Sequence, residues 1–98
     1  MTKRSSIEAA LRYMAPYIPD FEAGAIADHA LDSCGLNSAS PETAAWLSMV
    51  AFIRHALTEY DSLLEEGYDQ ESARNFVAGD IQAVLTEWGV RRPLNRSE

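Results

Sequence analysis

Apolar residues recur along this chain with the spacing of helices, and four segments carry that pattern. The first extends to Pro16 and starts with Ser5 and Glu8 at the spacing of a capping box. The second starts with Asp20 as its N-cap and ends at Gly35. No segment shows the alternation typical of strands, so the pattern predicts an all-α fold.

The third segment is the longest and has the clearest start, a Ser40 hydroxyl followed by Pro41 at the first helical position. Its apolar stripe is broad enough to contact two neighbouring helices. The stripe consists of Trp46, Val50, Ile53, Leu57, Tyr60 and Leu64. An unbroken helix from Pro41 to Glu66 would be about 39 Å long, which exceeds the rest of the domain. A kink near Thr58 or a protruding end is therefore the alternative to a straight helix.

The fourth segment follows a helix stop at Gly67, has Asp69 as its N-cap and ends at Gly89. Its apolar face consists of Ala73, Val77, Ile81, Val84 and Trp88, with Phe76 and Leu85 beside it. The expected architecture is a compact array of about four helices, in which the long third helix packs antiparallel to the fourth.

The domain is expected to span residues 6–89, between a flexible N-terminus (1–5) and a flexible basic tail (90–98). A chain of 98 residues suffices for one such domain. Domains of this size have little stability in reserve, so association with a second copy or another protein stays open.

Charge is distributed unevenly along the chain, whose net charge is −7. Between Tyr13 and Val90 there are thirteen acids and two bases, Arg54 and Arg74, which gives that part a charge of −11. Nucleic-acid binding depends on neutralising phosphates with basic side chains. A nucleic-acid partner is therefore not expected.

The single Cys34 excludes an intramolecular disulfide, which agrees with a reducing compartment, and the cytoplasm is the expected location. The longest strongly apolar run without charge, Thr43 to Ile53, is about half the roughly twenty residues that cross a bilayer. We therefore expect neither a membrane span nor a targeting segment.

Polar residues flank the apolar stripe of the third helix. On a helical wheel Arg54, Thr58, Asp61 and Glu65 fall on one side, and Arg54 comes within reach of Asp61 two turns later. One interpretation is a salt bridge at the rim of the core, with Arg74 able to pair with the same carboxylates. The alternative is a recognition patch for a partner or small ligand.

His55 has Glu59 one turn further on, which resembles half of a helical metal site or an acid–base pair. The other histidine, His29, is spaced from Asp32 in a similar way on the second helix. The doubled Glu-x-x-His signature of carboxylate-bridged bundles is absent, so neither a metal nor another cofactor is expected.

The motif R-H-x-x-T-x-Y-D-x-L-L-x-x-G-x-D-x-x-x-A-R occupies residues 54–74. It resembles a bacterial family of small helical domains of unknown function, and the likeness extends upstream through the letters PETAAW. The resemblance implies no activity, substrate, cofactor or mapped site. Packing accounts for the leucines and a helix stop for the glycine. The remaining candidates for partner or ligand binding are Arg54, His55, Thr58, Tyr60, Asp61 and Arg74.

Three functional hypotheses follow. The first, which we favour, is a non-enzymatic cytoplasmic protein-interaction or oligomerisation module, with a protein partner or self-association and no catalytic residue. The second is a small enzyme or a metal- or ligand-binding protein that uses the polar cluster. The third is an acidic regulator that mimics nucleic acid. Convergence of the six candidates around a hollow would favour a ligand site, and a spread along a rim would favour the interaction module.

Overall fold

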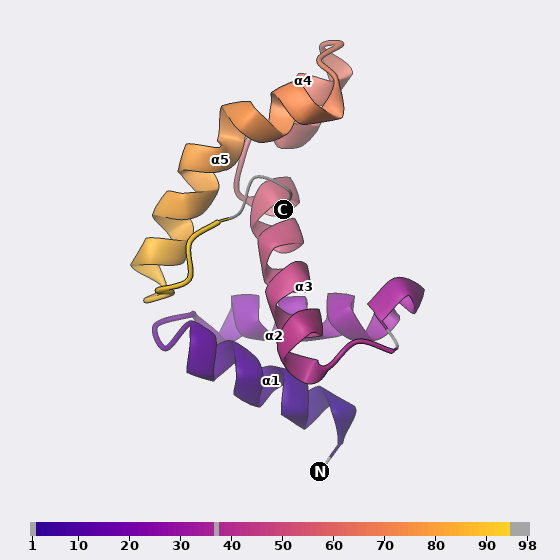
Figure 1. Ribbon diagram of the computed structural model, residues 1–98, viewed down its shortest axis with the longest axis vertical. Helices are drawn as coiled ribbons and strands as arrows, with labels where there is room; N and C mark the ends of the chain where they lie inside the picture. Colours follow the sequence, from indigo (N-terminus) through magenta and orange to yellow (C-terminus); the bar gives the residue numbers. More distant parts are fainter. Residues whose placement is uncertain (1, 37, 95–98) are drawn as a thin grey trace.

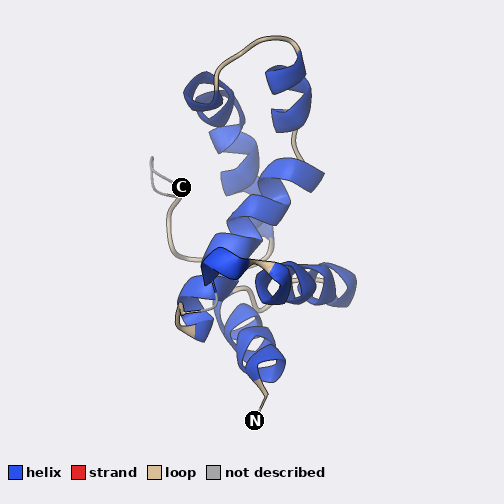
Figure 2. Ribbon diagram, turned by 90° about the vertical axis from the view of Figure 1, so that its right-hand side faces the viewer, coloured by secondary structure: helices blue, strands red, loops and turns tan. Residues whose placement is uncertain are grey.

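The computed structural model describes residues 2–36 and 38–94, without the side chain of Cys34. Helices dominate these residues, and none of them lies in a strand, so the all-α prediction is confirmed (Figure 2). The elements are α1 (Lys3–Met14), α2 (Asp20–Asp32), the short 3-10 turn η1 (Cys34–Leu36), α3 (Pro41–Ala56), α4 (Tyr60–Glu65) and α5 (Gln70–Glu87).

Helix α3 is the spine of the molecule (Figure 1). Helices α1 and α2 pack against it at one end, and α4 and α5 form a hairpin at the other. Helix α5 then runs back in the direction opposite to that of α3, as predicted, so that its end comes near α1 and α2. The apolar width of α3 is therefore used on two sides, against the α1–α2 pair and against α5.

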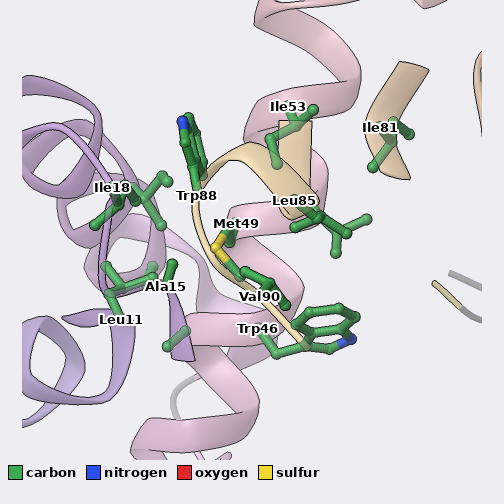
Figure 3. Packing of buried hydrophobic residues seen from close by; sticks show 14 of the residues in the cluster. Leu11, Ala15, Ile18, Trp46, Met49, Ile53, Ile81, Leu85, Trp88 and Val90 are labelled. Atoms are coloured by element: carbon green, nitrogen blue, oxygen red, sulfur yellow. The ribbon is translucent and has the colours of Figure 1, made fainter. Parts of the chain in front are cut away.

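The end of α5 closes the core (Figure 3). Trp88 is buried between Ile18 of the α1–α2 connection and Met49 of α3, and Val90 is buried near Met49 and Trp46 of α3. The backbone N–H of Tyr17 donates to the carbonyl of Trp88 at 3.0 Å. This contact fixes the α1–α2 turn to the end of α5.

The predicted starts of α3 and α5 are confirmed. The Ser40 hydroxyl accepts the backbone N–H of Thr43 at 3.2 Å, and the Asp69 carboxylate accepts that of Ser72 at 2.7 Å. Each cap satisfies an N–H that has no partner within its own helix.

Helix α1 starts earlier than predicted. Thr2 is its N-cap and forms a reciprocal capping box with Ser5, because its hydroxyl is available one turn before Ser5. The predicted box of Ser5 and Glu8 is therefore wrong, and Glu8 instead pairs with Arg4 at 3.2 Å.

The predicted cap of α2 is also wrong. Pro19 holds the N-cap position and has no side chain that could cap the helix. Asp20 is the first helical residue, and its carboxylate pairs with Arg12 at 2.8 Å.

The predicted helix stops at Gly67 and Gly89 are confirmed, and both have positive φ, +104° and +84°. After Gly67, the next backbone N–H donates to the carbonyl of Leu63 at 3.1 Å. After Gly89, the next N–H donates to the carbonyl of Leu85 at 2.9 Å. These are Schellman bonds, which satisfy the last carbonyls of a helix and require a residue that tolerates positive φ.

The third predicted helix is interrupted near Thr58, so the expected alternative of a kink there is confirmed. The Thr58 hydroxyl donates to the carbonyl of Arg54, and the same oxygen accepts the N–H of Tyr60 at 3.2 Å. A threonine that bonds backbone on both sides competes with helical hydrogen bonds. Thr58 therefore terminates α3 and starts α4 in a new direction, and Leu57 becomes 45% exposed.

Residues 90–94 lie against the body, although the sequence predicts a flexible tail there. The N–H of Leu94 donates to the Gln82 side-chain oxygen at 3.0 Å, and the guanidinium of Arg92 lies 4.2 Å from the centre of the Trp46 ring. Residues 95–98 of the predicted tail lie outside the described residues. Likewise, most of the predicted flexible N-terminus belongs to α1.

Candidate functional site

The polar candidates gather where α3 ends, α4 begins and α5 passes beside them. We call them the Arg54–Arg74 cluster: Arg54, His55, Thr58, Tyr60, Asp61 and Arg74. Helix α3 contributes the first two, the break contributes Thr58, α4 contributes Tyr60 and Asp61, and α5 contributes Arg74. Within the cluster the structure forms two groups, a buried one and an exposed one.

Arg54 is the centre of the buried group and is only 7% exposed. Its guanidinium carbon lies 5.7 Å from the centre of the buried Tyr60 ring, a cation–π contact. Its Nε is buried without a hydrogen-bond partner, and no carboxylate of residues 2–36 or 38–94 forms an ion pair with it.

The predicted salt bridge between Arg54 and Asp61 is therefore wrong. The wheel that placed them together assumes a continuous helix, but the chain turns at Thr58. Asp61 leaves the side on which Arg54 lies and pairs with His55.

His55 and Asp61 form the exposed group. Nδ1 of His55 lies 2.6 Å from a carboxylate oxygen of Asp61, and both side chains are more than half exposed. The His55 ring also meets the edge of Tyr60, with centroids 5.2 Å apart, which links the two groups. The predicted pairing of His55 with Glu59 is replaced by this one, again because the helix ends between them.

A histidine oriented by a carboxylate can exchange protons with a bound molecule. Nucleophilic catalysis further requires a hydroxyl or thiol hydrogen-bonded to that histidine. In the described part of the chain the nearest candidate by sequence is Thr58, whose hydroxyl bonds the backbone of Arg54 and Tyr60. The observed role of Thr58 is to shape the break.

Arg74 is half-buried on α5, and its Nε is also buried without a hydrogen-bond partner in the described part of the chain. It lines a surface hollow of about 480 Å³ together with Gln70, Glu71 and Asn75. These three were missed from the sequence. They lie within about one helical turn of Arg74, and that spacing is the signal that could have identified them.

The two arginines affect one another. Burial lowers the pKa of Arg54, the positive charge of Arg74 lowers it further, and Tyr60 acts in the opposite direction. Burial and the charge of Arg74 disfavour the charged form of Arg54, yet arginine stays protonated at any pH at which proteins fold. The folded domain therefore holds a buried cation, Arg54, whose charged form the nearby charge of Arg74 further disfavours.

The histidines do not form a metal centre within the described residues. His29 is exposed on α2, and His55 is at the end of α3. No group of three or more potential ligands among histidine, cysteine, aspartate and glutamate gathers in that part of the chain.

These features define a small all-α domain with two arginines, one of them buried, beside a helix break. The chain belongs to the DUF2293 family, described as "Uncharacterized conserved protein", whose profile matches residues 10–89. The match includes the whole Arg54–Arg74 cluster, and it confirms the expected kinship with a family of unknown function. Comparisons with curated proteins and with solved structures found no match. Among the described helices, none is long and apolar enough to cross a membrane.

Proposed function

We propose that the domain is a non-enzymatic protein-interaction or oligomerisation module of the cytoplasm, and that the Arg54–Arg74 cluster belongs to its contact region. The observation that carries this proposal is the exposure of large apolar side chains in the helices that also carry the cluster. Leu57 at the end of α3, Tyr68 in the α4–α5 turn and Phe76 on α5 are 45%, 54% and 66% exposed.

Phe76 is the most informative of these residues. Its position beside the apolar face of α5 predicts a buried side chain, but its ring faces solvent. Single exposed apolar residues are common, whereas several large ones on a small domain are typical of a surface that is covered in a complex. Aromatic side chains and arginine are also the residue types enriched in protein interfaces.

A second exposed apolar region lies at the α1–α2 turn. Tyr13, Tyr17 and Phe21 are 89%, 74% and 79% exposed. The α1–α2 turn lies beside the end of α5, whereas the Arg54–Arg74 cluster lies near the start of α5 (Figure 1). Two apolar regions at opposite ends suit a module that joins two partners or two copies, which supports an interaction role over a catalytic one.

Site-specific photo-crosslinking tests this proposal. A photoreactive amino acid at Phe76 is expected to give a discrete crosslinked product with a partner or a second copy. The matched control is the same amino acid at Leu47, which is 40% exposed on α3 outside the cluster. Light scattering over a range of concentrations would accompany it. A strict monomer, with crosslinking from Phe76 no stronger than from Leu47, would contradict the proposal.

A further inference from the structure

Arg54 and Arg74 are unusual for their charge environment. They are the two bases among residues 13–90, which contain thirteen acids. The fold nevertheless packs the end of α3 and the start of α5, which carry them, in one region and gives neither an acidic partner within the described residues. The exposed Arg4 and Arg12 behave differently, because each pairs with at least one carboxylate.

Burial makes this arrangement costly. Arg54 is only 7% exposed. Among the described residues, the Nε atoms of both Arg54 and Arg74 have no hydrogen-bond partner. Buried charges in proteins are nearly always paired, and buried donors nearly always have an acceptor. The cation–π contact with Tyr60 compensates one charge only in part. Within the described residues, the two arginines therefore lack a negatively charged partner, and each has one buried N–H donor without an acceptor.

We propose that Arg54 and Arg74 form a binding site for a doubly charged tetrahedral oxyanion of the phosphate class. Guanidinium groups donate pairs of parallel N–H bonds to oxyanions, and two of them can bind one phosphate. A dianion neutralises both arginines, whereas a single carboxylate neutralises only one. This charge balance favours phosphate over a carboxylate ligand.

The hollow on α5 provides the access. Arg74 lines it directly, with the amide side chains of Gln70 and Asn75, which can donate to the oxyanion. Glu71 also lines it and repels an anion, so Glu71 opposes binding. Arg54 does not line the hollow and contributes its charge from the buried side.

The phosphate group has two sources, free inorganic phosphate and a phosphate monoester. The chemistry that the two arginines recognise is shared by both. The site also stands independently of the proposed protein partner, because it rests on partnerless cations and not on exposed apolar side chains. Failure of one proposal therefore leaves the other intact.

Solution NMR of the full chain tests the site through the Nε–Hε signals of Arg54 and Arg74. Titration with inorganic phosphate is expected to shift both signals in a saturable way. Sodium chloride at equal ionic strength and sodium acetate are the controls, and neither should saturate them. Phosphoserine forms a parallel arm, in which tighter binding than that of inorganic phosphate identifies a monoester and equal binding identifies the free ion.

Arg74→Gln is the test variant, because Arg74 is only half-buried and the fold should tolerate the change. Its affinity for phosphate is expected to fall at least about tenfold, the loss of one charged hydrogen-bonding group. Arg12→Gln is the matched control, since Arg12 is exposed and paired with Asp20, and it should bind as the parent chain does. The proposal is overturned by unsaturable shifts, by equal saturation with acetate, or by equal losses in the two variants.

Discussion

The guanidinium carbon of Arg54 lies 5.7 Å from the centre of the Tyr60 ring. Tyr60 is the one side chain among the described residues that stabilises the Arg54 charge. The ring face attracts the cation, but burial and the neighbouring charge of Arg74 oppose it. Without a ligand, the charge of Arg54 is therefore only partly compensated in the folded domain.

Replacing Arg54 by methionine should stabilise the free domain. Met retains an unbranched apolar stem but removes the buried charge, and such replacements are often stabilising. In a buffer without multivalent anions we expect Arg54→Met to raise the free energy of unfolding by about 1 kcal/mol. Urea unfolding would measure it, with Arg12→Met as the control for loss of an exposed pair. A clear loss of stability in Arg54→Met would show that Arg54 serves the fold itself.

Replacing Ser48 by alanine should also stabilise the domain. Ser48 is fully buried on α3, and its hydroxyl has no hydrogen-bond partner among the residues that the structure describes. Removing an unsatisfied buried hydroxyl, with little change in volume and with better helix propensity, should add about 0.5–1 kcal/mol. Thermal unfolding of Ser48→Ala measures the effect. A decrease in stability would mean that the hydroxyl has a partner in solution.

Three glycines allow the effect of backbone conformation to be separated from that of steric contact. Gly79→Ala should stabilise by about 0.5–1 kcal/mol, because Gly79 is helical and a Cβ there would meet nothing within 4 Å. Gly67→Ala should destabilise by about 1–2 kcal/mol through its positive φ alone. Gly89→Ala should destabilise more, because its Cβ would also lie 2.8 Å from the Tyr17 ring.

Chemical denaturation of the three glycine variants would give this order directly. Equal effects at Gly67 and Gly89 would show that the Tyr17 ring moves freely and does not press on the end of α5. Destabilisation at Gly79 would contradict the open environment of that position.

Asp69 should make the stability depend on pH. The backbone N–H and then the hydroxyl of Ser72 bond its carboxylate and hold the pKa of Asp69 below its ordinary value. A carboxyl with a lowered pKa in the folded state stabilises the fold above its unfolded pKa, and this stabilisation is lost as pH falls through the folded pKa.

Asp69→Asn retains the cap but does not titrate. The parent chain should therefore be more stable than Asp69→Asn near neutral pH, and the difference should shrink on acidification. Melting temperatures of both proteins across a pH series would measure this. A difference that stays constant, or grows, as the pH falls would exclude Asp69 as the source.

The parts of the fold that were predictable from sequence depend on local interactions. The Ser40 and Asp69 caps act over three residues, and the stops at Gly67 and Gly89 depend on the conformational freedom of one residue. Such signals are contained within one turn of chain. The apolar period of α5 likewise predicts its buried side, because that helix is continuous.

The exposed side of Phe76 and the break at Thr58 depend on more distant packing. Thr58 can either continue the helix or bond its hydroxyl to the backbone. Which of the two occurs depends on where α4 and α5 pack. The partners of Arg54 and Asp61 depend in turn on that break. The six cluster residues were thus identifiable, but their pairing was not. A helical wheel assumes a single helix axis, whereas these residues lie on two helices with different axes.

The most direct test of the arginine pair is a crystal structure of the full chain grown with selenate, a tetrahedral dianion whose anomalous scattering locates it without ambiguity. We predict an anomalous peak in the hollow on α5, within hydrogen-bonding distance of the Arg74 guanidinium group. The contradicting result is a crystal in which a carboxylate of the chain itself pairs with Arg54, or in which selenate binds elsewhere and leaves both arginines without it.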